Sequence, residues 1–145
     1  MADLAWLEIK KENLTFNIKT LKTLAGEQVL MSPCVKANAY GHGLVETAKI
    51  FMAAGANWLA VNSVEEGQKL RESGFNQPIL IIGYAAEAEL AKILDLDLRL
   101  FVNNWPAAQK LSELGTKKNK KALIHLKIDT GMHRHGVLMA EAEEL

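Results

Sequence analysis

The chain has 145 residues, of which 49% are hydrophobic and 23% charged, and its formal net charge at pH 7 is zero. These values predict a soluble globular protein of about one domain's length, and the neutral charge argues against a surface for nucleic acid or anionic membranes. The single cysteine, Cys34, excludes an intrachain disulfide and is typical of a reducing compartment. Because we find neither a signal-peptide pattern nor a bilayer-spanning apolar run, we expect a cytoplasmic protein.

Short apolar runs alternate along the chain with stretches of helical periodicity. A strand is expected at 5–9, followed by an amphipathic helix at about 12–24 that ends at Gly26. Five more strands are expected at 29–36, 58–62, 79–83, 98–103 and 122–130. Helices are expected near 44–54, 64–73, 87–94 and 105–114. This order predicts βαβ units and a parallel sheet, so the expected fold class is α/β.

Two architectures are built from such units, the open doubly wound sheet and the (β/α)8 barrel. No Gly-x-Gly-x-x-Gly follows the first strand, which removes the main sequence argument for a nucleotide-binding open sheet. Pro33 lies inside the strand expected at 29–36 and lacks a backbone donor. We therefore expect a bulge or irregular pairing at that point.

The segment at 35–43 reads Val-Lys-Ala-Asn-Ala-Tyr-Gly-His-Gly and follows the apolar residues of that strand. It places Lys36 at a strand end, where a neutral amine could form a Schiff base with an aldehyde cofactor. Tyr40 offers a phenol to a phosphate, and Gly41 and Gly43 allow the backbone to approach an anion. A solvated lysine followed by an ordinary loop is the alternative.

The strand at 122–130 has a polar row because its side chains alternate between two faces. His125, Lys127 and Asp129 share one face, and apolar residues occupy the other. Both faces of a parallel sheet are usually covered, so such a row must be hydrogen-bonded, paired or functional, and in a barrel it would line the lumen. A solvent-facing edge strand would also explain it. Arg134 follows the turn at Gly131 and could bind a carboxylate or a phenolate with two hydrogen bonds.

Other constellations have weaker support. Asp-Thr-Gly at 129–131 occurs in aspartic proteases, but those are all-β proteins. His125, His133 and His135 are an incidental group rather than a metal site, since no cysteine and a single acid lie near them in sequence, so no metal is expected. The chain has no Gly-x-Ser-x-Gly elbow and no P-loop.

Both motifs together resemble one family, the alanine racemases, which are pyridoxal-phosphate enzymes with a (β/α)8 barrel and a second, mostly β domain. The resemblance rests on 35–43, on Lys-Ile-Asp-Thr-Gly-Met-His-Arg-x-Gly at 127–136, and on Trp6, Glu8 and Asn17. It extends over essentially the whole chain.

The resemblance implies that Lys36 holds pyridoxal 5'-phosphate as an internal aldimine and acts as the base on the D-alanine face of Cα. Tyr40 would bind the cofactor phosphate, and Arg134 would contact the cofactor's phenolic oxygen and the substrate carboxylate. Lys127 would be carbamylated and, as an anion, would hold Arg134, which a cationic lysine would repel. The family's reaction interconverts L-alanine and D-alanine and supplies D-alanine for peptidoglycan.

The family's chains are well over twice as long. Residues 1–145 are therefore expected to be the N-terminal portion of the barrel, roughly its first five strands, without the β domain. By the resemblance, that domain supplies the tyrosine that acts as the opposite base, across the interface of a homodimer. Because racemisation needs a base on each face of Cα, we expect this chain alone to be inactive. The alternatives are a non-catalytic pyridoxal-phosphate-binding barrel, a structural or regulatory fragment, and a related amino-acid decarboxylase.

Overall fold

A parallel sheet organises the structure, a computed structural model that describes residues 5–143. Its strands are β1 (Leu59–Val61), β2 (Ile79–Ile81), β3 (Arg99–Val102) and β4 (Leu123–Leu126). They lie side by side in chain order, with Leu59 opposite Ile79 and Leu100 opposite Ile124. The strands predicted at 58–62, 79–83, 98–103 and 122–130 are confirmed, with shorter bounds.

The strand predicted at 29–36 is reduced to a single bridge, in which Cys34 pairs with Ala60 beside β1. Val35 N donates to Ala60 O at 2.8 Å, and Ala60 N donates to Pro33 O at 3.0 Å. Proline has no N–H to extend the ladder, so the irregular pairing expected at Pro33 is confirmed. This segment is a fifth, rudimentary strand at the edge of the sheet next to β1.

The strand predicted at 5–9 is wrong. These residues have no regular structure, and no strand within residues 5–143 pairs with them. Trp6 and Leu7 are exposed, although their apolar side chains suggested a buried element. A short apolar run becomes a strand only where a neighbouring strand accepts its backbone hydrogen bonds.

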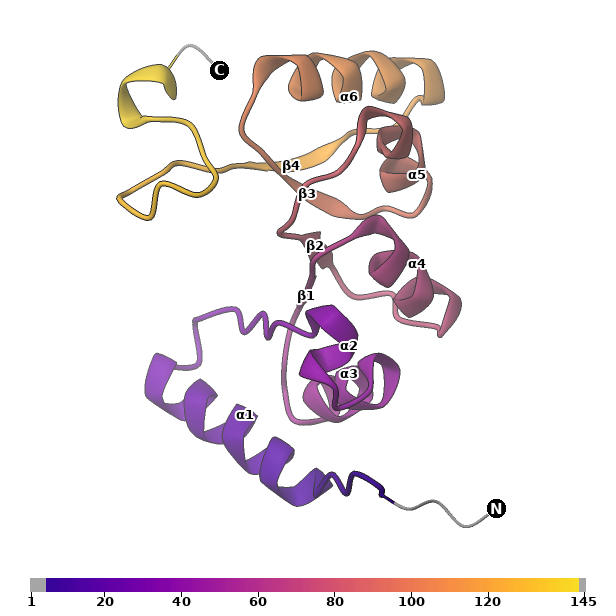
Figure 1. Cartoon of the computed structure of the whole chain (residues 1–145), viewed down its shortest axis with the longest axis vertical. Helices are drawn as coiled ribbons and strands as arrows, with labels where there is room; N and C mark the ends of the chain where they lie inside the picture. The colour runs from indigo at the N-terminus through magenta and orange to yellow at the C-terminus, as the bar shows by residue number, and fades with distance from the viewer. Residues whose placement is uncertain (1–4, 144–145) are drawn as a thin grey trace.

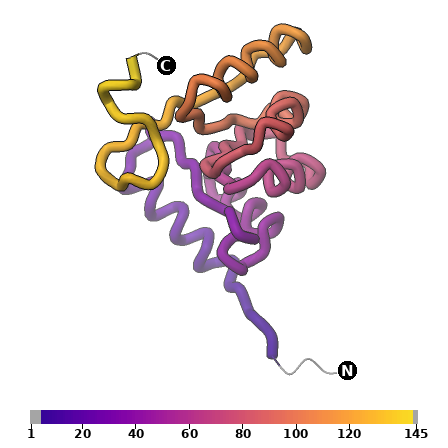
Figure 2. The backbone as a smooth tube through the Cα atoms, turned by 45° about the horizontal axis from the view of Figure 1, so that its top comes forward, coloured from indigo at the N-terminus to yellow at the C-terminus, as the bar shows by residue number. Residues whose placement is uncertain are grey.

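Helices connect the strands and confirm the alternation that the sequence predicted. They are α1 (Lys11–Ala25), α2 (Lys36–Tyr40), α3 (Leu44–Ala53), α4 (Val64–Glu72), α5 (Leu90–Asp95) and α6 (Trp105–Lys118), with short 3-10 turns η1 (Glu87–Glu89) and η2 (Met139–Glu141). Figures 1 and 2 show α1 at one end of the row of helices and α6 at the other. No helix within residues 5–143 is both long enough and apolar enough to span a membrane.

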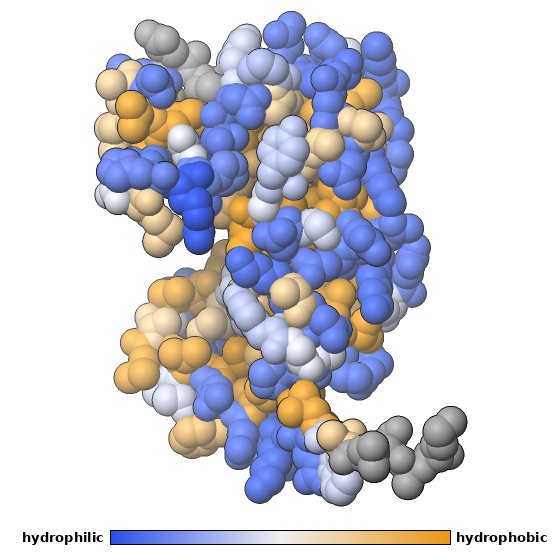
Figure 3. Space-filling model, viewed as in Figure 1, coloured by the Kyte–Doolittle hydropathy of each residue, from blue (hydrophilic) through white to orange (hydrophobic). Residues whose placement is uncertain are grey.

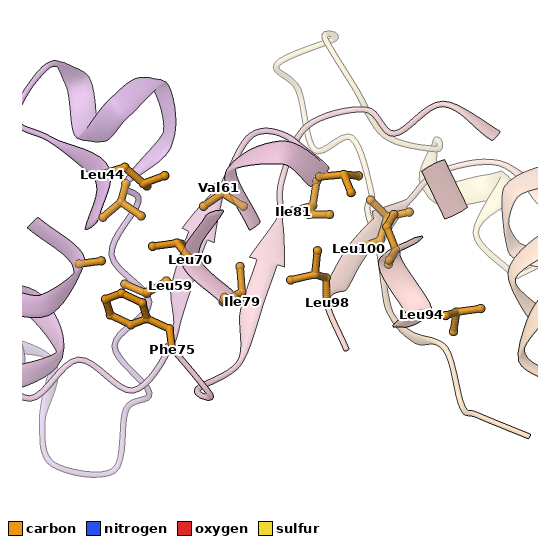
Figure 4. Close-up of a cluster of buried hydrophobic side chains, with 14 of the residues drawn as sticks. Leu44, Leu59, Val61, Leu70, Phe75, Ile79, Ile81, Leu94, Leu98 and Leu100 are labelled. Carbon is orange, nitrogen blue, oxygen red and sulfur yellow. The ribbon is translucent and has the colours of Figure 1, made fainter. Parts of the chain in front are cut away.

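The hydrophobic core lies between the sheet and one layer of helices. Leu59, Ile79 and Leu100 point from consecutive strands to the same side, where side chains from α3, α4, α5 and α6 pack against them. Figure 4 shows this continuous apolar cluster. The layer ends at β4, where Ile124 and Leu126 are 45% and 40% exposed on the same outer side.

The opposite side of the sheet is strongly curved. The rings of Trp58 and His125 lie 5.8 Å apart, although they belong to the strand positions of β1 and β4, with β2 and β3 between them. In a flat sheet three strand spacings would separate their backbones by about 14 Å. One helical layer outside and converging side chains inside are the features of a barrel rather than of a doubly wound sheet, which has helices on both faces.

Candidate functional site

The short helix α2 is a left-handed turn. Four consecutive residues, Ala37 to Tyr40, have φ angles between 52° and 56°. Each non-glycine residue in this region costs about 1 to 2 kcal/mol, so the turn stores strain on the order of 5 kcal/mol. Such strain persists only where the surrounding structure holds the backbone in place.

Several hydrogen bonds hold this turn. Ala39 N donates to Val35 O at 2.8 Å, and Gly43 N donates to Asn38 O at 2.9 Å. The Asn38 side chain accepts from Leu44 N at 2.9 Å and so caps α3, whose N-cap residue Gly43 has no side chain. The turn and the start of α3 therefore form one hydrogen-bonded unit.

Lys36 lies directly after the bridge between Cys34 and Ala60, at the carboxyl end of the edge strand, where the left-handed turn begins. Val35 before it is fully buried in the hydrophobic core. Lys36 is half-buried, and its Nζ makes no hydrogen bond or ion pair with any residue from 5 to 143. An amine in this position is available for chemistry.

Tyr40 lies one turn beyond Lys36, and its hydroxyl donates to Cys34 Sγ at 3.4 Å. The hydrogen bond with Cys34, the thiol's charge when ionised, and burial all raise the pKa of Tyr40 above its usual value. The phenol therefore stays protonated and can donate. A thiol is a weak acceptor, so a phosphate oxygen could replace it as the partner of Tyr40.

Sequence reasoning missed Glu66, which lies in the first turn of α4. Its Oε1 accepts from Ala37 N at 2.6 Å, and its Oε2 accepts from Asn62 N at 2.8 Å. The spacing Ser63-x-x-Glu66 is that of a capping box and could have drawn attention to this carboxylate. A capping box predicts a bond to the backbone of Ser63 itself, so the contact with Ala37 could not have been foreseen.

The polar row predicted on β4 faces the inside of the curve. His125 meets the ring of Phe101 edge-on at 6.0 Å, and Lys127 Nζ lies 5.3 Å from the centre of the same ring. The Arg99 guanidinium stacks 4.4 Å from the centre of the Trp58 ring. Arg99 Nε and His125 Nε2 are buried and have no hydrogen-bond partner within residues 5–143. This inner face is therefore rich in basic groups and has unmet hydrogen-bonding capacity.

Asp129 organises the loop that follows β4. Its side chain is 9% exposed and accepts from Gly131 N and His133 N, both at 3.0 Å, and it lies 3.2 Å from His133 Nδ1. The two backbone hydrogen bonds are the main cause of its lowered pKa. Both carboxylate oxygens of Asp129 are thus engaged in contacts within the loop. Aspartic proteases are all-β proteins, whereas this fold is α/β, so the aspartic-protease alternative is wrong.

The same loop gathers basic side chains. The pKa of His135 is lowered first by burial and then by the positive charges of Lys127 and Arg134. Arg134 is exposed and makes no hydrogen bond or ion pair with residues 5–143. His135 also lines a pocket at the carboxyl ends of β2 and β3, next to Phe101 and Asn103. No group of three metal-binding side chains was found in the described part of the chain.

The site residues thus fall into two groups. One consists of Lys36 and Tyr40, and the other of Lys127, Arg134 and His135. Both follow the carboxyl ends of strands and lie at the same edge of the sheet, at its first and last positions. No hydrogen bond or ion pair among residues 5–143 joins them. Figure 3 shows a recess between the part of the surface formed by the 127–143 segment and the part that includes α1.

Comparisons with known proteins agree on one family. A family model described as alanine racemase, N-terminal domain, matches residues 9–145. An alanine racemase of Carboxydothermus hydrogenoformans is 41% identical over 140 residues, which are 97% of this chain and 38% of that protein. One from Symbiobacterium thermophilum is 40% identical and is covered to 37%. The chain therefore spans somewhat over a third of the length of these curated relatives.

Solved structures show the same relation. The alanine racemase of Clostridium difficile 630 in complex with cycloserine superposes with a TM-score of 0.88 and 35% identity, over 92% of this chain and 37% of that one. The enzyme from E. faecalis gives a TM-score of 0.82 and 33% identity, over 93% of this chain and 37% of its own. The curved sheet described above therefore corresponds to the N-terminal part of their barrel.

Proposed function

The chain belongs to the family of alanine racemase N-terminal domains, and from that membership we propose that it forms the pyridoxal-phosphate-binding part of an enzyme that interconverts L-alanine and D-alanine. In this proposal residues 1–145 are the first portion of the barrel domain. The observation that supports it best is the strained turn that carries both Lys36 and Tyr40 at the carboxyl end of the edge strand.

The residues of this turn suit pyridoxal phosphate. Lys36 Nζ has no partner within residues 5–143 and can bond to the cofactor's aldehyde carbon, with release of water. Tyr40 can donate to the phosphate. A Cβ placed on Gly41 or Gly43 would meet no atom within 4 Å, so a ligand can approach the backbone there.

When bound, pyridoxal phosphate would withdraw electrons and stabilise the negative charge that develops at the substrate Cα. Lys36 would remove or return the proton on the D-alanine face of that carbon, for which its amine must be neutral. Arg134 would bind the substrate carboxylate and the phenolic oxygen of the cofactor, since its exposed guanidinium can donate two parallel hydrogen bonds.

A chemical labelling experiment tests the assignment of Lys36. The protein is incubated with pyridoxal phosphate, reduced with borohydride and digested, and the labelled peptide is identified by mass spectrometry. The pyridoxyl group is expected on Lys36, and Lys36→Ala should remove it. Tyr40→Phe should keep the label on Lys36 but require more cofactor. A label confined to another lysine would refute the proposal.

We propose that Lys127 carries a carbamate. It shares the inner face with His125 and lies near Arg134 and His135 without a carboxylate partner in residues 5–143. Carbon dioxide bonded to the neutral amine, with loss of a proton, would replace a repelled cation with an anion that pairs with Arg134. Lys127→Ala should lose activity that small carboxylic acids partly restore. An unmodified Lys127 in the active enzyme would contradict this idea.

Racemisation also needs a base on the opposite face of Cα, and we propose that a tyrosine outside residues 1–145 supplies it, from the partner of a homodimer. Losing one acid or base typically costs about 10²- to 10⁴-fold in rate. The chain with added cofactor should therefore convert L-alanine at least about 100-fold more slowly than a chimaera continued by the unmatched part of the Carboxydothermus relative. Equal rates would show that both bases lie within this chain.

We further propose that the enzyme works in the cytoplasm and supplies D-alanine for peptidoglycan. The same chimaera should then allow a bacterial strain that depends on added D-alanine to grow without it. A Lys36→Ala version is the matched control and should not support growth.

A further inference from the structure

Glu66 joins the site turn to the neighbouring strand. Its two carboxylate oxygens accept from Ala37 N at 2.6 Å and from Asn62 N at 2.8 Å, and these donors lie 25 positions apart in the sequence but at the same edge of the sheet. We propose that Glu66 is a positioning residue that sets the direction of Lys36 and Tyr40. This inference rests on the proposed function, because it concerns how the lysine is presented to a cofactor.

The bond to Ala37 lies where the left-handed turn needs support. Ala37 is its first residue with positive φ, and the hydrogen bonds within the turn begin only at Ala39, which donates to Val35 O. Without Glu66, the N–H of Ala37 would lose its acceptor at the residue next to Lys36. A charged acceptor forms a stronger hydrogen bond than a neutral one, which suits a backbone held in a strained conformation.

The second bond gives the carboxylate a rigid anchor. Asn62 follows β1, and its carbonyl oxygen is packed so closely against Gly83, just beyond β2, that a Cβ there would collide with it. Ser63 accepts from Glu66 N at 3.3 Å, which fixes the backbone of Glu66 at the start of α4. The carboxylate therefore links the backbone of the turn to the end of β1 and the start of α4.

The side chain of Lys36 depends on this support. It is half-buried, and no contact fixes its tip, because its Nζ has no partner within residues 5–143. Its direction therefore depends on the adjacent backbone, which the bond from Ala37 N to Glu66 holds in place. Glu65 provides a matched comparison, because it carries the same charge in the same helical turn. It is exposed and makes no hydrogen bond or ion pair in the described part of the chain.

The test compares Glu66→Gln with Glu65→Gln in the chain itself. Amide hydrogen exchange is measured at Ala37 and Asn62, and the rate of borohydride-trapped labelling of Lys36 is measured at saturating pyridoxal phosphate. Glu66→Gln should speed exchange at Ala37, with or without a change at Asn62, by about tenfold to a hundredfold and slow labelling of Lys36. Glu65→Gln should change neither. Exchange at β1 and β2 amides reports whether each variant is folded.

A third variant separates positioning from stability. Leu111→Ala removes a buried side chain from α6, far from the turn, and should destabilise the fold while the labelling rate of Lys36 at saturating cofactor stays unchanged. Equal exchange at Ala37 in the two glutamine variants would overturn the proposal. Faster exchange with an unchanged labelling rate would also overturn it. One further outcome separates this inference from the proposed function. If the unaltered chain is not labelled at Lys36, while Glu66→Gln still speeds exchange, the proposed cofactor chemistry fails, but the conclusion that Glu66 holds the backbone of the turn stands.

Discussion

Replacing Asn38 measures the strain stored in the site turn. Asn38 has φ 56°, and its side chain accepts from Leu44 N at 2.9 Å. Asn38→Ala removes the hydrogen bond, which contributes about 1 kcal/mol, and introduces a residue that tolerates the left-handed region less well, at about 1 kcal/mol more. We therefore expect the free energy of unfolding to fall by about 2 kcal/mol.

Asn38→Gly separates these two contributions. It removes the same hydrogen bond but adopts a positive φ without steric cost, so we expect a loss of only about 1 kcal/mol. Asn38→Asp keeps an acceptor oxygen for Leu44 N and should stay within about 0.5 kcal/mol of the parent chain. The expected order of stability is therefore the parent and Asn38→Asp, then Asn38→Gly, then Asn38→Ala.

Urea unfolding followed by tryptophan fluorescence gives these differences. For a chain of this size, 1 kcal/mol corresponds to a shift of about 3 °C in the melting temperature, so a thermal scan provides a second measurement. Equal stabilities of Asn38→Ala and Asn38→Gly would mean that position 38 is not left-handed in solution. The account of the turn as a strained element would then be wrong.

Three further predictions concern the sheet edge and the loop after β4. Gly83→Ala should cost about 1 to 3 kcal/mol in urea unfolding, because its Cβ would collide with the Asn62 carbonyl, and a neutral effect would contradict that contact. The pKa of Asp129 is lowered, so its carboxylate stabilises the fold above its unfolded pKa of about 4, and this stability is lost as the pH falls through the lower folded pKa. The stability difference between the parent chain and Asp129→Asn should therefore shrink on acidification, and a difference independent of pH would refute this. The pKa of His135 is lowered by burial and by two cations, so an NMR titration should show it rising when bicarbonate allows Lys127 to become a carbamate. An unchanged His135 pKa under those conditions would argue against the modification.

The sequence predicted the alternating elements well because each is defined by local periodicity. The apolar runs that became β1, β2 and β3 are short and fully or largely buried, and each is followed by a helix; Ser63 caps α4 after β1, and Asn104 caps α6 after β3. The run at 5–9 has a similar apolar content but no strand beside it within the described residues. Whether such a run pairs depends on the rest of the fold, which local pattern does not contain.

The site was predicted in part. The spacing of Lys36 and Tyr40 and the shared face of His125 and Lys127 follow from the motif and from strand alternation, and the roles proposed for these residues stay predictions. The left-handed turn was not foreseen, because alanine and tyrosine disfavour positive φ. Local hydrogen bonds hold it together with one contact that is distant in the sequence, the bond from Ala37 N to Glu66, which no local pattern reveals.

The curvature of the sheet gives this molecule an optical signature. Trp6 and Trp105 are 75% and 55% exposed, whereas Trp58 is half-buried between Arg99 and His125 on the inner face. A quencher dissolved in water will extinguish the emission of the two exposed indoles first. The emission that survives comes from Trp58, and it will persist only while the strand positions of β1 and β4 bend toward each other. Light emitted by one indole thus reports how far the sheet has curled.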